Sequence, residues 1–431
     1  MTLKKVNFIR ILMMIFILQT VSIPGYALAN TQDISVEVDG IPVQFDVSPV
    51  IENGRTLVPF RAIAEALQVE VVWDEQSKSI RGGSERTSVE LQIGNSVAQA
   101  NSVPVALEVA PKIIKDRTFI PLRFFSEAFQ ADVKWDGAER KVSIQSPPTE
   151  MKVVSYYALG STNGDTDLTS WTDLFGVPYP QISVGHTDLV NELAFGWYSL
   201  DDQGNLLTID RKTGWQKPSG WEEVLQSATA YQLDTSMTIL LPDNDPRMMS
   251  ILSDKGKTEQ AIQSIMEEAK LFQGINLDIE GLGLNQPASQ LAETKKQFTQ
   301  FVRALYEQAK EQGLQLTLTL HPINSSYKGY DYQQLSQVSD EIIIMAYNYL
   351  PINAPEPLAQ VEEAIRLAVK EVPKNKLLLG ISAYHETSES IINKVGLVKK
   401  YNLKGIALWR LGLVKDDMWD ALKSTIKVNP S

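Results

Sequence analysis

Two carboxylates lie two residues apart in an apolar run near the middle of the chain. Residues 274–280 read GINLDIE. Successive side chains of a β-strand point to opposite faces, so Asn276, Asp278 and Glu280 share one face and the aliphatic residues share the other. Two acids this close cannot both ionise cheaply, so the pKa of one should rise and make it a candidate general acid near neutral pH. The competing interpretation is that both acids are solvated, or paired with Lys or Arg.

Aromatic side chains end two later apolar runs. Residues 344–349 read IMAYNY, which places Met345 and Tyr347 on one strand face, and residues 407–410 read ALWR, which ends a strand at Trp409. An indole ring is a natural surface for the apolar face of a sugar. Taken singly, such a Tyr or Trp is most often a packing residue. A binding site is favoured only if both meet the acid pair, Asp278 and Glu280, at one end of the strands.

The elements that would position these groups form a regular series after Lys152. Eight short apolar runs alternate with amphipathic segments, and several of the segments are clear helices, such as Thr258–Phe272, Leu291–Gln312 and Leu358–Val372. The series predicts an α/β domain, a (β/α)8 TIM barrel, in which catalytic side chains follow the C-terminal ends of the strands. An open doubly wound sheet would need a Gly-rich phosphate loop, and residues 159–165 lack that spacing. The expected strands are Val153–Tyr157, Glu192–Tyr198, Ser236–Leu240, Gly274–Ile279, Gln315–Leu320, Glu341–Tyr347, Leu377–Ala383 and Gly405–Trp409.

The first third of the chain contains an internal repeat. Residues 41–80 return at 103–142 with a constant offset and no gap, so that Trp73-Asp74 recurs as Trp135-Asp136. Each copy predicts short strands, one helix and a further hairpin, and residues 33–146 are therefore expected to form a small duplicated α+β domain. The two Trp residues are either sugar-stacking surfaces or, as is commoner, core residues. Pro147-Pro148 marks a linker, so we expect the barrel over residues 150–431.

The composition limits the possible chemistry. Hydrophobic residues make up 43% and charged residues 21% of the 431 residues, as in ordinary globular proteins. The 40 Lys and Arg against 52 Asp and Glu give a net charge of -12, which argues against a nucleic-acid or anionic-membrane surface. The chain has no cysteine and 3 histidines, which excludes thiolate nucleophiles and disulfides and argues against a multi-histidine metal centre. We expect no cofactor and no metal.

The N-terminus is typical of an export signal. Basic side chains at Lys4, Lys5 and Arg10 precede a mostly apolar run over residues 11–23, and Ala27-Leu28-Ala29 offers a cleavage site. A membrane-spanning helix would need roughly 20 apolar residues, so an uncleaved anchor is the lesser alternative. We expect residues 1–29 to be a signal peptide, and the mature protein to be secreted or held in the cell wall without membrane association.

These motifs resemble two known families. Residues 273–280 resemble the D-G-x-D-x-D-x-E signature of family 18 glycoside hydrolases, the chitinases and related endo-N-acetylglucosaminidases, and the likeness covers residues 152–425. Residues 405–412 are similar to the spore and cell-wall members of that family. The V-P-x-R-x-x-x-E-A-x-x-x-x-V-x-W-D pattern of each repeat resembles the small module at the N-terminus of copper amine oxidases, of which we expect two copies. Copper is not implied, because no ligand is present.

The resemblance implies a retaining mechanism in which the substrate supplies its own nucleophile. Glu280 would protonate the glycosidic oxygen while the substrate's 2-acetamido oxygen attacks the anomeric carbon. Asp278 would orient the acetamide group and stabilise the positive charge, and Tyr347 would hydrogen-bond the acetamide oxygen. The implied substrate-binding residues are Trp409, which would stack beneath the sugar, and Tyr156, Asn276, Met345 and Asn348.

The sequence departs from the family pattern at three positions. Gln273 and Asn276 stand where the signature has Asp, and Asn348 stands where an Asp usually follows the Tyr. About twenty residues separate the expected seventh and eighth strands, so the insertion domain of many chitinases is missing, and we expect a shallow, open cleft. His321 and His385 end expected strands and either line this cleft or are exposed loop residues.

The leading hypothesis is therefore a secreted glycosidase that cleaves β-1,4-linked N-acetylglucosamine polymers. Peptidoglycan is favoured over chitin or N-linked glycans, because the export signal, the repeats and the missing insertion domain all suit a wall enzyme. The repeats would then be wall-associated. Two alternatives stay open: a catalytically weak or inactive, chitinase-like glycan-binding protein, which the departures at Gln273 and Asn348 support, and a structural or adhesive wall protein.

Overall fold

The computed structural model describes residues 33–83, 87–157, 169–349, 354–384 and 386–428. The expected signal peptide, residues 1–29, lies outside these ranges. From Ile34 onward the chain forms one compact unit. Across the described ranges, no helix combines the length and the apolar character that crossing a bilayer requires.

Residues 34–146, called the N-terminal module below, consist of two halves with the same order of elements, as the repeat predicts. Each half has four short strands, a helix and a hairpin, and β7 (Ser88–Gln92) is inserted between the halves. The first half comprises β1 (Ser35–Val38), β2 (Ile41–Pro42), β3 (Val50–Glu52), β4 (Arg55–Pro59), α1 (Phe60–Ala66), β5 (Glu70–Asp74) and β6 (Ser79–Gly83). The second comprises β8 (Val97–Ala100), β9 (Val103–Ala106), β10 (Lys112–Ile114), β11 (Arg117–Pro121), α2 (Leu122–Ala128), β12 (Asp132–Asp136) and β13 (Lys141–Gln145).

The two halves of the N-terminal module pack on each other reciprocally. Strands β4 and β11 pair antiparallel, with Val58 opposite Ile120. Arg55 of the first half pairs with Glu108 of the second, and Arg117 of the second pairs with Asp46 of the first. A contact that is repeated in both directions is the mark of a two-fold interface. The repeat therefore specifies an internal pseudo-dimer.

The commoner interpretation of the repeated Trp residues, that both belong to the core, is wrong for one of them. Trp135 is 41% exposed, whereas Trp73 is half-buried and packs against the core of the module. Phe125 and Phe129 do fill that core, with ring centroids 5.1 Å apart. Their i,i+4 spacing puts both rings on the buried face of α2.

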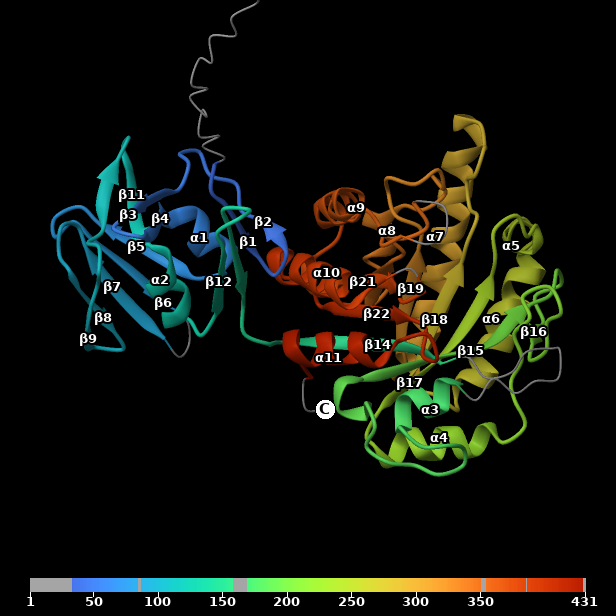
Figure 1. The fold of residues 1–431 in the computed structure, drawn as a ribbon. Coiled ribbons are helices and arrows are strands. Elements are labelled where there is room, and N and C mark those ends of the chain that lie inside the picture. The colour runs from blue at the N-terminus through green and yellow to red at the C-terminus, as the bar shows by residue number, and fades with distance from the viewer. Residues whose placement is uncertain (1–32, 84–86, 158–168, 350–353, 385, 429–431) are drawn as a thin grey trace, which may run out of the picture. The chain divides into compact units, whose positions relative to one another are not determined.

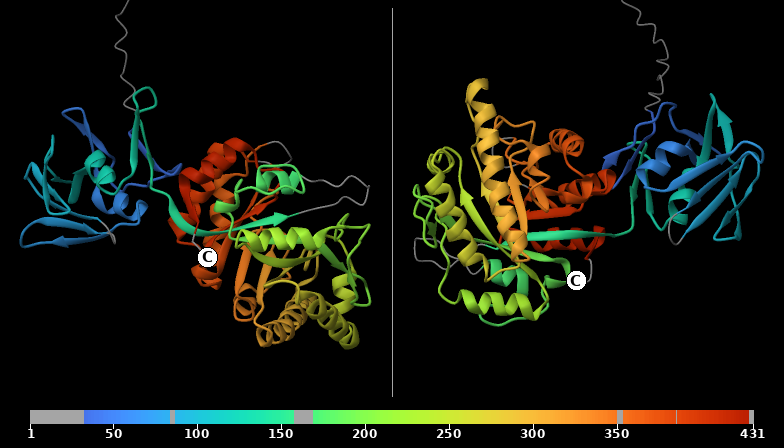
Figure 2. Two further views of the ribbon diagram at one scale, coloured as in Figure 1. Left: turned by 90° about the horizontal axis from the view of Figure 1, so that it is seen from below. Right: turned by 180° about the vertical axis from the view of Figure 1, so that it is seen from behind.

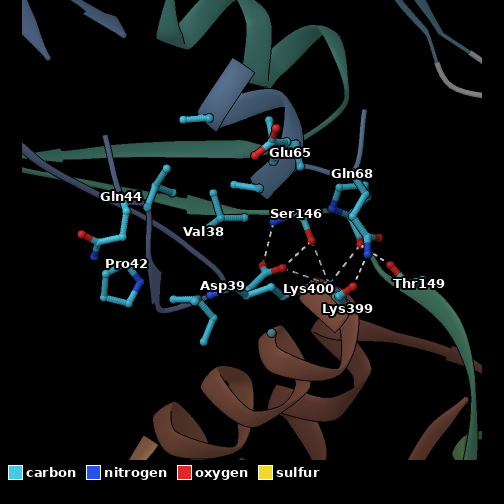
Figure 3. Close-up of a pocket in the computed structure, with 17 residues that line it drawn as sticks. Val38, Asp39, Pro42, Gln44, Glu65, Gln68, Ser146, Thr149, Lys399 and Lys400 are labelled. Atoms are coloured by element: carbon cyan, nitrogen blue, oxygen red, sulfur yellow. Dashed lines mark hydrogen bonds and ion pairs between the residues drawn. The ribbon is translucent and has the colours of Figure 1, made fainter. Parts of the chain in front are cut away.

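Asp39 of the N-terminal module lies in a buried polar cluster with Ser146 and with Lys399 of α10 (Ser388–Tyr401) (Figure 3). Asp39 accepts hydrogen bonds from the backbone N–H of Ser146, at 2.8 Å, and from its hydroxyl, at 2.5 Å. The ammonium of Lys399 lies 3.5 Å from the Asp39 carboxylate and donates to the Ser146 hydroxyl at 2.9 Å. Burial lowers the pKa of Lys399, although Asp39 opposes the shift. Because each polar group in this cluster already has a partner, we assign it a structural role.

The second domain is a closed barrel of eight parallel strands, as the sequence predicts (Figures 1 and 2). Each strand pairs with the next along the chain, and β22 pairs with β14 to close the sheet. Strand β16 (Leu206–Leu207) adds antiparallel to β15, and β23 (Ile426–Val428) adds parallel to β14. The barrel strands are β14 (Thr149–Tyr157), β15 (Glu192–Leu200), β17 (Asp234–Leu241), β18 (Gly274–Ile279), β19 (Gln315–Leu320), β20 (Glu341–Ile344), β21 (Leu377–Ser382) and β22 (Gly405–Trp409).

Helices surround these strands on the outside of the barrel (Figure 1). Strand β20 ends at Ile344, three residues earlier than expected, because the N–H groups of Ala346 and Tyr347 turn back to the carbonyls of Ile344 and Met345. Between β21 and β22 the described residues form one helix, α10. The helices are α3 (Thr169–Phe175), α4 (Trp221–Ala230), α5 (Arg247–Leu252), α6 (Lys255–Ala269), α7 (Ala288–Glu311), α8 (Tyr332–Leu335), α9 (Leu358–Glu371), α10 (Ser388–Tyr401) and α11 (Asp416–Thr425), with 3-10 turns at Thr187–Leu189 and Lys374–Lys376.

A charged layer fills the inside of the barrel at the N-terminal ends of its strands. Glu341 is fully buried and accepts from Lys152 at 2.7 Å and from Lys404 at 2.6 Å. Lys152 also pairs with Glu192, which in turn accepts from the Ser236 hydroxyl. Burial alone would raise the pKa of Glu341, but the charges of the two lysines outweigh it and lower that pKa. This layer lies at the opposite end of the strands from the acid pair.

We expect Glu341→Gln to lower the free energy of unfolding by about 3–5 kcal/mol, because removing one partner of a buried ion pair leaves the other charge uncompensated. Urea unfolding followed by circular dichroism measures this loss. The matched control is Glu363→Gln, which breaks an exposed pair with Arg366 on α9 and should unfold at nearly the same urea concentration as the native protein. Equal midpoints for the two variants would show that the charged layer contributes little.

Candidate active site

Strand β18 delivers the acid pair to the C-terminal end of the barrel. Asn276 and Asp278 are 0% and 3% exposed and point inward, whereas Ile275, Leu277 and Ile279 are buried under the helices. Glu280 follows directly after the strand, and its N–H donates to the carbonyl of Leu241 at 2.8 Å. The alternation read from the sequence therefore describes the actual faces of β18.

The pKa values of both members of the acid pair are raised, not of one alone. Burial, followed by the charges of Glu280 and Asp243, holds the pKa of Asp278 well above its usual range. Burial and then the charge of Asp243 raise the pKa of Glu280 to about 7. Oδ1 of Asp278 is buried without a hydrogen-bond partner among the described residues. The pair therefore retains a proton near neutral pH and has an acceptor ready for a ligand.

Three polar side chains support the pair from inside the barrel. The Asn276 amide donates to the Tyr156 hydroxyl at 3.1 Å and accepts from the Thr319 hydroxyl at 2.8 Å. The hydroxyls of Tyr156 and Thr319 are 2.6 Å apart. Because both ends of the Asn276 amide and the Tyr156 hydroxyl are already bonded, these residues hold the floor of the site. Their direct contact with substrate stays a prediction.

Tyr347 lies beside the acid pair, whereas the side chain of Asn348 does not. The charge of Asp278, after burial, contributes to raising the pKa of Tyr347, and its ring packs over Gly380, where an added Cβ would meet Cε1 at 3.2 Å. Met345 is buried at 3% exposure. Asn348 has an exposed side chain and a φ of 62°, and its N–H donates to Glu356 at 2.7 Å. The structure thus brings Tyr347 to the acid pair and turns the side chain of Asn348 to the surface.

A second Trp, which the sequence analysis missed, joins Trp409 at this end of the barrel. Trp409 packs edge-on against Tyr156, with centroids 5.1 Å apart. Trp215, from the segment after β16, stacks on Trp409 at 6.1 Å and 20°. A side chain at Gly196 would meet the Trp215 ring at 3.2 Å, so this glycine of β15 makes room for the indole. The two half-buried indoles present a stacked aromatic surface, and no local motif marked Trp215.

If the substrate is the one that the resemblance implies, we expect Trp215→Ala to raise KM for N-acetylglucosamine oligomers by about tenfold, which corresponds to about 1.4 kcal/mol of lost contact, while kcat changes less. Steady-state kinetics on soluble oligomers measures both constants. Trp135→Ala, which removes an exposed Trp of the N-terminal module, is the control and should leave KM unchanged. An unchanged KM in Trp215→Ala would remove the aromatic surface from the binding site.

Three consecutive strands end in a polar cluster that includes Glu280. Asp243 follows β17 and His321 follows β19, so both flank Glu280 after β18. His321 Nε2 lies 3.1 Å from Oδ1 of Asp243, the Tyr327 hydroxyl donates to Oδ2, and the His321 and Tyr327 rings stack at 3.7 Å. Single ligand atoms of Asp243, Glu280 and His321 lie within 4.8 Å of one another, which is close enough to share a cation. Since both Asp243 oxygens already accept hydrogen bonds, we interpret the group as a hydrogen-bonded cluster.

The other residues named from the sequence lie away from the acid pair or outside the described ranges. Gln273 lies at the opposite end of β18, where its side chain accepts from the N–H of Thr235 at 2.9 Å. The remaining histidine, His186, has no role assigned from the sequence; it stacks on Trp419 at 4.4 Å, and burial lowers its pKa. His385 is outside the described residues. The substitution at Gln273 therefore leaves the surroundings of Asp278 and Glu280 unchanged.

Comparison with known families matches both domains of the chain. The family model described as "Glycosyl hydrolases family 18" matches residues 152–388. The model described as "Copper amine oxidase N-terminal domain" matches residues 37–144 once, across both halves of the repeat. The single match does not show the two copies expected from the sequence, since the pair of halves together corresponds to one such module.

The individual relatives are distant in sequence. The cortical fragment-lytic enzyme of Bacillus subtilis is 22% identical in an alignment 279 residues long, and the match covers 47% of this chain and 63% of that protein. The crystal structure of the Bacillus cereus spore cortex-lytic enzyme gives a TM-score of 0.53 at 17% identity, covering 66% of this chain and 76% of the other. A Chromobacterium violaceum chitinase gives 0.51 at 18%, covering 64% and 98%. At these identities the structural matches show the fold.

Proposed function

The chain belongs to family 18 of the glycosyl hydrolases, and from this premise we propose that it cleaves β-1,4-linked N-acetylglucosamine polymers by a retaining, substrate-assisted mechanism. The observation that carries the proposal is the acid pair at the C-terminal end of β18, with the pKa of Glu280 raised to about 7. A carboxylic acid that titrates near neutral pH is what protonation of a glycosidic oxygen requires.

In the proposed first step, Glu280 protonates the glycosidic oxygen. The substrate's acetamide oxygen attacks the anomeric carbon, the bond to the leaving sugar breaks, and an oxazolinium ion forms. The unpartnered Oδ1 of Asp278 accepts a hydrogen bond from the acetamide N–H. That bond stabilises the ionised form of Asp278, so the proton shared by the pair moves onto Glu280 when substrate binds.

In the proposed second step, Glu280 acts as the base. Having lost its proton, it takes one from a water molecule that attacks the anomeric carbon and opens the oxazolinium ring, so the product keeps the configuration of the substrate. Asp278, now ionised, stabilises the positive charge of the ring, and the Tyr347 hydroxyl donates to the acetamide oxygen. Trp409 and Trp215 hold the apolar face of the sugar.

Peptidoglycan is the proposed natural substrate. The expected signal peptide at residues 1–29 would export the protein to the wall, and the N-terminal module would keep the barrel near its polymer and raise the effective concentration. The similarity to spore cortex-lytic enzymes supports the same choice. In this proposal the enzyme is secreted, with residues 33–146 as the wall-associated part and residues 150–431 as the catalytic part.

Incubating the purified full chain with peptidoglycan sacculi tests the proposal. New reducing ends on N-acetylglucosamine, identified by mass spectrometry after borohydride reduction, are the expected result. Chitin oligomers in a parallel reaction show whether the peptide-bearing polymer is preferred. Binding to sacculi without any new reducing end would favour the alternative of a non-catalytic glycan-binding protein.

A further inference from the structure

Asp243 is the nearest charged neighbour of Glu280 that the family signature does not include. Strands β17 and β18 run side by side, with Leu241 opposite Ile279, so the residues that follow them meet at the end of the barrel. The backbone N–H of Asp243 donates to the Glu280 carboxylate and by itself lowers the pKa of Glu280, but the charge of the Asp243 side chain, which raises that pKa, has the larger effect. One residue thus provides both a hydrogen bond and a negative charge to the same side chain.

The backbone keeps Asp243 in this place. Gly281, with a φ of 76°, follows Glu280, and a side chain there would come within 3.1 Å of the Asp243 Cα and 3.2 Å of the Asn244 nitrogen. Asn244 has a φ of 61° and turns the chain after Asp243. A left-handed glycine therefore allows the loop after β17 to approach the residue after Glu280 closely.

Two side chains fix the Asp243 carboxylate. His321 bonds Oδ1 at 3.1 Å and Tyr327 donates to Oδ2, and the two rings stack on each other. Burial lowers the pKa of His321 in spite of Asp243, so the ring is neutral at neutral pH and Nε2 carries the hydrogen it donates. The cluster therefore presents a net negative charge to Glu280.

Further titratable groups face Glu280 from the neighbouring elements, and the charge of Asp243 has to be weighed among them. Asp278 comes from the same strand, and the tyrosines come from the segments after β19 and β20. The phenols are neutral near pH 7, since their pKa values are raised. The groups are Asp243, Asp278, His321, Tyr327, Tyr330 and Tyr347.

We propose that Asp243, held by His321 and Tyr327, is a positioning residue that orients the Glu280 side chain and keeps a proton on it until the glycosidic oxygen accepts that proton. The inference rests on the proposed role of Glu280 as the acid. This role explains why the Asp243 carboxylate, which is hydrogen-bonded on both oxygens, lies beside Glu280, which must stay protonated until it acts. No signature residue supplies this function.

The pH dependence of kcat/KM on soluble N-acetylglucosamine oligomers tests the proposal. The native enzyme should lose activity as the pH rises above about 7, because the acid form of Glu280 is consumed. Asp243→Asn removes the neighbouring charge. It should shift the alkaline limb of the pH profile of kcat/KM to lower pH by on the order of one unit. Asp202→Asn, an exposed Asp, is the matched control and should leave the limb in place. A folded Asp243→Asn enzyme with the native limb would overturn the proposal.

Tyr327→Phe separates orientation from charge. It removes the hydroxyl that holds Oδ2 but leaves the Asp243 charge, so the limb should stay in place while kcat falls and KM changes little. A native kcat in this variant would contradict the orienting role of the cluster.

A second measurement does not depend on turnover. The pKa of Glu280 is higher in the folded chain than its usual 4.5, so its contribution to stability is full below pH 4.5 and is lost as the pH rises through about 7. Asp243→Asn should flatten the fall in melting temperature across this range, and the flattening should be smaller when Glu280→Gln is already present. An equal effect in both backgrounds would mean that Asp243 does not act on Glu280. If the native protein shows this coupling between Asp243 and Glu280 but no turnover, the proposed function is wrong while the interaction of the two residues stands.

Discussion

Replacing Glu280 by Gln is expected to lower kcat on N-acetylglucosamine oligomers by about 100- to 10,000-fold, the usual contribution of a positioned general acid. Gln has nearly the same shape as Glu but cannot protonate the leaving oxygen, so folding and glycan binding should survive. Steady-state kinetics and a melting curve measure the two properties. Glu293→Gln, an exposed change on α7, is the matched control and should behave like the native enzyme.

The leaving group distinguishes loss of the acid from general damage. An aryl glycoside leaves as a stabilised phenolate and needs little protonation, so Glu280→Gln should lose much less activity on it than on an oligomer. Equal losses on the two substrates would show that Glu280 is not the acid.

The second large effect is expected for Asp278→Asn. Losing a group that stabilises charge only in the transition state typically costs about 100- to 1,000-fold in kcat. Asn carries no negative charge to stabilise the oxazolinium ion, and its amide oxygen is a weaker acceptor than the carboxylate Oδ1 that is unpartnered in the structure. KM should change little, since the proposed sugar-binding surface of Trp409 and Trp215 stays intact.

The aryl glycoside again gives the contrast. Because the proposed role of Asp278 is to act on the nucleophilic acetamide and not on the leaving group, Asp278→Asn should lose activity equally on the aryl glycoside and on the oligomer. Rescue of this variant by a good leaving group would assign proton transfer, and not charge stabilisation, to Asp278.

The parts of the fold that depend on local pattern could be predicted from the sequence. Strands β18, β19 and β22 have the expected bounds, and the helices α6, α7 and α9 lie within a few residues of theirs. Period-2 and period-3.6 patterns are local, and eight of them in series leave few architectures. The closure of the barrel between β14 and β22 then follows from the geometry of parallel strands.

The missed features depend on contacts between distant segments. Asp243 lies in a polar loop, PDND, that resembles any turn, and only the parallel register of β17 and β18 brings it to Glu280. Trp215 meets Trp409 across 194 positions of sequence, through a gap left by Gly196. Strand β20 ends early because the N–H groups of Ala346 and Tyr347 bond to carbonyls of their own segment and not to a neighbouring strand. No side-chain pattern in the sequence indicates this turn. Asp243 also contributes, after burial, to the raised pKa of both acids, and this contribution depends on the same register.

The most direct test of the central claim compares fully acetylated with de-N-acetylated glucosamine oligomers of equal length, using the full chain at one pH and measuring initial rates of hydrolysis. In the proposed mechanism the nucleophile is the acetamide oxygen of the substrate, so the acetylated oligomer should be cleaved and the de-N-acetylated one should be hydrolysed at or near the background rate. Comparable rates on the two oligomers would contradict substrate assistance and point to direct attack by a protein carboxylate, with Asp278 the nearest candidate.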